Sequence, residues 1–215
     1  MLDLTFSHIF PCLEQAWIAL EAAEVPYKFE QVSLYGSGGK PSWFMKLNPK
    51  GQVPVVVVNN DNDKEKVILA DSDLILDEME LVMDSCAKSS SSSSTRLLAG
   101  KNDEKIKAFR SVLRKFLPIG KSAVLGGDKE RMWSKLRELD KVMDTNGQAS
   151  YICSGTDQPT IADCAGFPFL WRIDNEFGSD SWESHGCQNI SAWLEFCKRQ
   201  PPFENSIQRS WWWWW

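Results

Sequence analysis

Residues 48–58 read NPKGQVPVVVV, a loop that leads into an unbroken apolar run. Asparagine, proline and glycine are typical of turns, and the four valines that follow are typical of a buried strand. Val53-Pro54 begins this strand, a position where proline is tolerated because the ladder loses no hydrogen bond there. We therefore predict a buried strand over 53–59 that follows a tight loop.

The segments around this strand alternate between strand patterns and helix patterns. A helix between two strands favours a parallel strand pair, and the turn-rich connection after the valines favours a hairpin. We expect a mixed sheet of about four strands with helices on its faces, in the order βαβ-α-ββα. The predicted strands are 2–6, 28–34, 53–59 and 66–70, and the predicted helices are 12–24, 41–47 and 71–84.

Beyond residue 85 the strand pattern disappears. Residues 86–98 contain six consecutive serines and are predicted to be a flexible linker between two domains, 1–85 and 99–205. The second domain is predicted to be all-helical, and its clearest signal is Thr160 to Asp163, which has the spacing of a capping box. The predicted helices lie near 101–117, 128–146, 160–176 and 189–199.

The last segment, 206–215, is predicted to be a tail outside both domains, and it includes five tryptophans at 211–215. No folding argument requires this sequence. Two interpretations stay open: the tryptophans are foreign to the natural chain, or they contact a protein groove or a lipid headgroup layer. The first interpretation is open for the serine run too.

The composition argues against several function classes. The formal net charge is −5 at pH 7 and lysine and arginine are not clustered, which argues against nucleic-acid binding. No apolar segment approaches the roughly 18–20 residues that span a bilayer. The six cysteines are irregularly spaced, and His185 and Cys187 lack companions for a zinc site, so we expect reduced thiols and no metal. We expect a cytoplasmic location, or an organelle if a transit peptide was removed.

Four short motifs stand in a fixed order along the chain. They are Lys40-Pro41-Ser42-Trp43-Phe44, the segment from Asn48 to Val55, the pair Asp71-Ser72, and Thr160 to Asp163. Together they resemble the soluble glutathione S-transferase family over residues 2–205, and the chain looks closest to the omega- and lambda-like classes. The resemblance implies an α/β plus all-α fold: an N-terminal thioredoxin-like domain followed by an all-helical C-terminal domain.

The resemblance also implies a glutathione site in the N-terminal domain. In the family the Val-Pro bond is cis, and the main-chain groups of Val53 pair with the cysteinyl backbone of glutathione. The pair Asp71-Ser72 stands where the family holds the γ-glutamyl end, and a helix N-terminus suits its carboxylate. Lys40 would reach the glycine carboxylate. The implied glutathione-binding residues are Lys40, Gln52, Val53, Pro54, Asp71 and Ser72.

The group that handles the sulfur chemistry stays open. Cysteine-using classes of the family begin the first helix with Cys-Pro-Phe, whereas this chain reads Phe10-Pro11-Cys12 and has Phe10 at the nucleophile position. In one alternative Cys12 is the reactive thiol, because a helix N-terminus favours a thiolate. In another, the Ser7 hydroxyl, or more weakly His8, stabilises the glutathione thiolate. In a third, Cys12 is a small buried core residue.

The helical domain is expected to form the wall of the acceptor-substrate pocket. The resemblance places Arg172 and Trp193 in that wall. Trp171 and Phe10 are further candidates for the pocket. Phe167 and Phe169 are predicted to be core.

Two functions from different classes follow. The first is a transferase or thiol reductase that uses glutathione as co-substrate, without a metal, and acts on a small hydrophobic electrophile or a disulfide. The second is a non-catalytic interaction module within a larger assembly, which the phenylalanine at position 10 favours. The resemblance suggests a homodimer, and membrane association is expected only if the tryptophan tail belongs to the natural chain.

Overall fold

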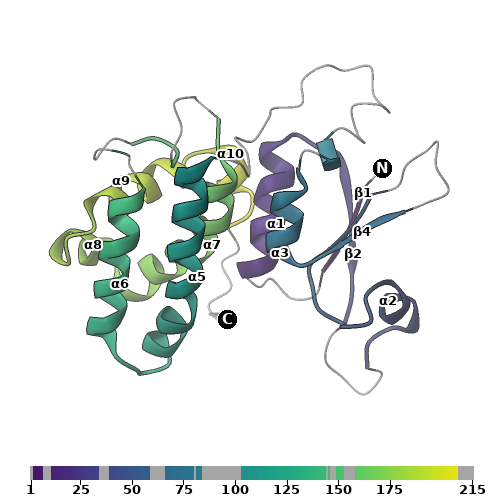
Figure 1. Cartoon of the computed structure of the whole chain (residues 1–215), viewed down its shortest axis with the longest axis horizontal. Coiled ribbons are helices and arrows are strands. Elements are labelled where there is room, and N and C mark those ends of the chain that lie inside the picture. Colours follow the sequence, from purple (N-terminus) through teal and green to yellow (C-terminus); the bar gives the residue numbers. More distant parts are fainter. Residues whose placement is uncertain are drawn as a thin grey trace. The chain divides into compact units, whose positions relative to one another are not determined.

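The chain divides into two units, Met1–Leu97 and Leu98–Trp215 (Figure 1). The structure is a computed structural model that describes residues 2–6, 11–33, 39–58, 66–79, 81–83, 103–143, 145, 149–152 and 158–207. The predicted linker over 86–98 and the tryptophans at 211–215 lie outside the described residues.

The N-terminal unit is built on a four-stranded mixed sheet. The strands lie in the order β2-β1-β3-β4, with β1 parallel to β2 and antiparallel to β3, and β3 antiparallel to β4. The predicted parallel pair and hairpin are therefore confirmed. The strands are β1 Leu2–Phe6, β2 Tyr27–Gln31, β3 Val55–Val58 and β4 Val67–Ala70, and the helices are α1 Pro11–Ala22, α2 Ser42–Leu47 and α3 Ser72–Asp77. Met79 and residues 81–83 are also helical.

Strand β3 is the centre of this unit. Its four valines are all buried, and it pairs with β1 on one side and β4 on the other. Val55 and Val57 pack against Val32 and against Phe44 of α2. Successive side chains of a strand point to opposite faces, so the other two valines serve the opposite face of the sheet. Helices α1 and α3 lie side by side along the sheet, away from α2 (Figure 1).

Several boundaries differ by one or a few residues from the sequence predictions. Strand β3 begins at Val55 rather than at residue 53, because Pro54 has no N–H to donate to a ladder. Helix α2 begins at Ser42, with Pro41 at the N-cap position and not in the first turn. Strand β2 ends at Gln31, earlier than predicted.

The described part of the C-terminal unit is helical, as predicted. Helix α5 continues through Pro118 and so extends beyond its predicted end at 117, whereas α7 continues through Pro168 as predicted. Helices α8 and α10 were not predicted, since four or five residues are too few to show a helical period. The helices are α5 Glu104–Val124, α6 Lys129–Val142, α7 Ile161–Phe177, α8 Asp180–Ser184, α9 Gln188–Cys197 and α10 Pro201–Glu204.

The N-terminus of α9 is stabilised by a residue from another helix. The N-cap residue Cys187 makes no side-chain hydrogen bond to the helix. Instead, the Asp140 carboxylate on α6 accepts from the Ile190 main-chain N–H at 2.8 Å and from Asn189 Nδ2 at 2.9 Å. Asp140 thus satisfies an N–H that has no acceptor within α9, and it joins α6 to α9.

We expect Asp140→Ala to lower the free energy of unfolding by about 1–3 kcal/mol, because the Ile190 N–H and the Asn189 amide lose a buried acceptor. Urea unfolding of the full chain measures this change. The matched control is Glu138→Ala on the same helix, which removes only a surface ion pair with Lys135 and should cost less than about 1 kcal/mol. Equal losses in the two variants would contradict the capping role of Asp140.

Candidate functional site

The loop before β3 is closed by one buried side chain, Asn48. Asn48 Nδ2 donates to the Gln52 main-chain oxygen at 2.8 Å, and Asn48 Oδ1 accepts from the Lys50 N–H at 3.2 Å. The Gly51 N–H donates to the Asn48 main-chain oxygen at 2.8 Å. These bonds fix the main chain that leads into Val53. Asn48 was not among the predicted site residues, although it begins the Asn-Pro motif that the sequence displays.

Lys40 lies against this loop. Gly51 has φ of 64°, in the left-handed region that favours glycine. A Cβ atom at Gly51 would stand 2.7 Å from Lys40 Nζ and 3.2 Å from Met45 Sδ, so the ammonium group is close to the main chain here. The peptide bond between Val53 and Pro54 is cis, as the resemblance implies.

Asp71 joins the loop to helix α3. Its main-chain N–H donates to the Pro54 oxygen at 3.4 Å. Its side chain caps α3, since Oδ1 accepts from the N–H groups of Asp73 at 2.9 Å and Leu74 at 3.3 Å. Asp71 has φ of 121° and ψ of 133°, a conformation that is rare for residues with a side chain and that tends to occur at functional sites. Ser72, the next residue, is half-buried.

Cys12 belongs to the same region. It lies in the first turn of α1, is half-buried, and its Sγ stands 3.8 Å from the main-chain oxygen of Val53. The predicted residues Lys40, Gln52, Val53, Pro54, Asp71 and Cys12 therefore lie along one connected set of contacts. The other three candidates, Ser7, His8 and Phe10, lie outside the described residues.

The other described cysteines are core residues. Cys164, Cys187 and Cys197 are all buried. Burial raises the pKa of Cys187 to about 12. Burial, reinforced by the negative charge of Asp163, holds the pKa values of Cys164 and Cys197 well above the usual thiol range. Among the four thiols in the described part of the chain, Cys12 is thus the one that is not buried.

In the helical unit, Trp171 and Arg172 pack on each other. The Arg172 Cζ atom stands 5.2 Å from the ring centroid of Trp171, and Nη1 donates to the Pro168 main-chain oxygen at 2.7 Å. Both side chains are largely buried, so their role as a pocket wall stays a prediction. Phe167 and Phe169 are buried, as predicted for core residues.

Trp193 has a structural role in this unit. Its side chain is fully buried, and its indole N–H donates to Asp163 Oδ1 at 2.7 Å. Asp163 completes the predicted capping box with Thr160 and also accepts from the Ile152 N–H at 2.8 Å. Burial raises the pKa of Asp163 to about 6, although these hydrogen bonds oppose the rise. Trp193 thus contributes to the core of this unit, and its place in the wall of a substrate pocket stays a prediction.

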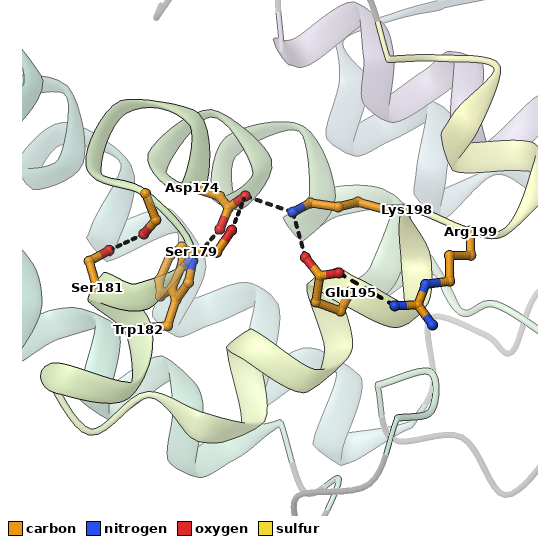
Figure 2. A network of polar contacts seen from close by, with 8 residues as sticks. Asp174, Ser179, Ser181, Trp182, Glu195, Lys198 and Arg199 are labelled. Atoms are coloured by element: carbon orange, nitrogen blue, oxygen red, sulfur yellow. Dashed lines mark hydrogen bonds and ion pairs between the residues drawn. The ribbon is translucent and has the colours of Figure 1, made fainter.

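A second polar network holds the later helices together (Figure 2). Asp174 on α7 accepts from Trp182 Nε1 on α8 at 2.7 Å and from Lys198 Nζ at 2.7 Å. Lys198 also donates to Glu195 on α9 at 2.8 Å. Burial opposes the charge on Lys198, but the bonds to these carboxylates outweigh it and raise the pKa of the ammonium. The network links three helices and explains their packing.

Within the described ranges, no group of three or more histidine, cysteine, aspartate or glutamate side chains could hold a metal ion. In the same ranges, no helix combines the length and the apolar character needed to cross a membrane.

Both halves of the chain match models of one protein family. The model for the N-terminal domain of glutathione S-transferases matches residues 11–81, and the model for the C-terminal domain matches residues 122–196. The two domains that the fold displays are thus the two domains of these enzymes, in the same order. The chain belongs to the glutathione S-transferase family.

Individual relatives are distant. The chain is 33% identical over 70 residues to a probable glutathione S-transferase DHAR2, chloroplastic, of Oryza sativa subsp. japonica, and 36% identical over 70 residues to glutathione S-transferase DHAR3, chloroplastic, of Arabidopsis thaliana. Each match covers 33% of this chain but only 22% and 24% of the two relatives.

Solved structures show the same fold at lower identity. The trimeric glutathione transferase TDR1 of Leishmania aligns with 97% of this chain and 46% of its own, with TM-score 0.71 and 21% identity. Glutathione transferase Omega 2S of Trametes versicolor, solved with 2,4-dihydroxybenzophenone, aligns over 95% of this chain and 92% of its own, with TM-score 0.70 and 21% identity.

We expect iodoacetamide to modify Cys12 in the folded chain much faster than Cys164, Cys187 and Cys197. The reagent attacks thiolates, and the raised pKa values and burial of those three thiols suppress both ionisation and access. Mass spectrometry of peptides after timed labelling at pH 8 measures the rates, and urea-unfolded chain is the control in which all four should react alike. Modification of the three core thiols at the rate of Cys12 would contradict the assignment.

Proposed function

We propose that this chain binds glutathione and acts as a glutathione transferase or glutathione-dependent thiol reductase similar to the omega-like classes. One observation carries the proposal: Lys40, the Val53-Pro54 segment, Asp71 and Cys12 converge on a single loop from four separate parts of the N-terminal unit. This region offers a cation, main-chain polar groups, a carboxylate and a thiol, which are the groups that a charged thiol tripeptide requires.

The proposed binding mode uses the two ends of the site. Lys40 would bind the glycine carboxylate, since its ammonium already lies at the loop. Asp71 Oδ1 is engaged in capping α3, which leaves Oδ2 to accept from the γ-glutamyl ammonium. The Ser72 hydroxyl and the N-terminus of α3 would bind the γ-glutamyl carboxylate. Gln52 is exposed beside the loop and would contact the same peptide.

Between these ends, the main chain of Val53 would pair with the cysteinyl unit as an added strand does. The same Val53 oxygen is now 3.8 Å from Cys12 Sγ. An incoming peptide N–H would compete with the thiol for this acceptor, so binding of the tripeptide would release Cys12 at the place where the sulfur of glutathione arrives.

The proposed reaction of Cys12 is thiol–disulfide exchange with a glutathione mixed disulfide. The Cys12 thiolate attacks the glutathione sulfur, a new disulfide forms, and the substrate thiolate leaves and takes up a proton. The thiolate of a second glutathione then attacks that disulfide, which restores Cys12 and yields glutathione disulfide. Ser7 remains the alternative, in which its hydroxyl stabilises the thiolate of bound glutathione for attack on a small hydrophobic electrophile.

Non-catalytic use of the fold is not favoured, because both matched models and the named relatives are transferases. Trp171 and Arg172 are the proposed acceptor-pocket residues of the helical unit. The names of the plant relatives include "chloroplastic", which supports an organelle as the alternative to the cytoplasm.

We expect calorimetric titration of the reduced full chain to show saturable glutathione binding, and Lys40→Ala to weaken it by roughly tenfold, as loss of one charge-assisted contact does. Lys46→Ala is the matched control, because Lys46 is also an exposed lysine of this region but lies in the last turn of α2; it should leave binding nearly unchanged. Absence of saturation at millimolar glutathione, or equal effects of the two substitutions, would refute the proposed site.

We expect Cys12→Ser to abolish glutathione-dependent reduction of a small mixed disulfide, because the new disulfide cannot form, while glutathione binding is retained. The assay couples glutathione disulfide production to a reductase. Full reductase activity in the variant would remove Cys12 from the mechanism and leave Ser7 and His8 as candidates. Loss of binding would instead show that the substitution damages the site.

A further inference from the structure

Met45 is the exposed methionine of the part of the chain that the structure describes. The residue is 36% exposed. The other four described methionines are buried: Met79, Met83, Met132 and Met143. Oxidation converts the flexible, apolar thioether of methionine into a polar, chiral sulfoxide, and enzymes can reverse this change. An oxidant dissolved in water therefore reaches the Met45 sulfur before it reaches the sulfurs of the core.

The Met45 sulfur lies beside Lys40 at the proposed glutathione site. A Cβ atom at Gly51 would stand 3.2 Å from Met45 Sδ, 3.0 Å from Lys40 Cδ and 2.7 Å from Lys40 Nζ. The thioether, the lysine stem and the ammonium group thus lie around one point above the main chain of Gly51. Gly51 itself is buried, although both of these neighbours are exposed. A change of polarity at the sulfur is therefore felt directly by the ammonium group.

Both sides of this contact are anchored in the fold. On one side, the Met45 N–H donates to the Pro41 oxygen at 3.1 Å, and the preceding residue, Phe44, is buried against valines of β3. On the other side, the hydrogen bonds of Asn48 close the loop that contains Gly51. Oxidation of the sulfur would therefore leave the main chain in place and act on the side chains alone.

The oxygen of a sulfoxide at this position would need a hydrogen-bond donor. The nearby main-chain donors are already used, because the Gly51 N–H bonds to the Asn48 oxygen at 2.8 Å and the Lys50 N–H bonds to Asn48 Oδ1 at 3.2 Å. The Lys40 ammonium, by contrast, forms no ion pair within the described ranges. A hydrogen bond from an ammonium group is also stronger than one from a neutral donor. Lys40 is thus the favoured partner of an oxidised Met45.

We propose that Met45 is a reversible oxidation site that controls the proposed glutathione site: a hydroperoxide converts its thioether to the sulfoxide, whose oxygen accepts from the Lys40 ammonium and withdraws it from the glycine carboxylate. The effect on binding rests on the function proposed above. In the reaction, a sulfur lone pair attacks the terminal peroxide oxygen, an S–O bond forms and the O–O bond breaks. The proton of that oxygen passes to the leaving group, which departs as water or an alcohol. The sulfur loses two electrons and the peroxide gains them.

Timed treatment of the full chain with hydrogen peroxide tests the modification site. Met45 is oxidised at least about tenfold faster than the four buried methionines, because they are shielded from the reagent. Mass spectrometry of peptides measures each rate, and in urea-unfolded chain the five rates become similar. Oxidation of the buried methionines at the rate of Met45 in the folded chain overturns the proposal.

The hydrogen bond to Lys40 is tested without glutathione. Acetic anhydride acetylates free amines, so an ammonium held by the sulfoxide oxygen reacts at least about twofold more slowly after peroxide treatment. Lys46 is the matched control, because it is an exposed lysine next to Met45, and its rate stays the same. In Met45→Leu, peroxide leaves the rate of Lys40 unchanged. An equal rate of Lys40 acetylation before and after oxidation of the wild type overturns the proposed contact.

Calorimetric titration with glutathione tests the control of binding. Peroxide, followed by dithiothreitol to reduce oxidised thiols, weakens the affinity by about three- to tenfold, as loss of one charge-assisted contact does. Methionine sulfoxide reductases restore it, and in Met45→Leu the affinity is the same before and after peroxide. An equal loss in Met45→Leu assigns the effect to another group and overturns the proposal.

The titration also separates this proposal from the function on which it rests. If the untreated chain does not bind glutathione, the proposed function fails, and the oxidation rates and Lys40 acetylation still decide whether Met45 is the modification site. If the untreated chain binds glutathione and the oxidised chain binds it equally well, the glutathione site stands and its control by Met45 is refuted.

Discussion

The pairing of β3 on both of its edges is the constraint on which the N-terminal unit depends. Four consecutive buried valines hold this strand between β1 and β4, and its start carries the loop closed by Asn48. The main chain of Val53 therefore lies between this closed loop and the paired strand. Asp71 is then held to the same place by its N–H bond to Pro54. The proposed glutathione site is thus positioned by an apolar strand.

This dependence explains why so much of the fold could be predicted from local patterns. Three local sequence patterns each predict part of this fold: the valine run, the turn residues before it, and the helix pattern between two strand patterns. The three predictions agree with one another. The capping box at Thr160 and Asp163 was predicted for the same reason, since both partners lie within one turn. The predicted helix end at 117 was wrong because α5 continues through Pro118, where tertiary packing overrides a local rule.

The missed residues share a different cause: their partners are distant in the sequence. Asp140 caps a helix that begins 48 residues later. No sequence pattern near Asp140 indicates this role. The bond from the Trp193 indole N–H to Asp163, thirty positions earlier, likewise has no local signal in the sequence. Cys12 was left open by the sequence because a thiol in a first turn suits both a core and a site; its contact with the Val53 oxygen now places it beside the glutathione site proposed above.

The buried Asp163 carboxylate links folding of the helical unit to proton binding. Its pKa is raised to about 6 in the folded chain, against about 3.8 when it is exposed. Below the lower value both states are protonated. Between the two values the folded state keeps the proton that the unfolded state has released, so unfolding liberates a proton and the contribution of Asp163 to stability falls as the pH rises through this window. Above about pH 6 the dependence ends. A residue that joins Thr160, Ile152 and Trp193 thereby makes this domain more tolerant of mild acid than its carboxylate content alone would suggest.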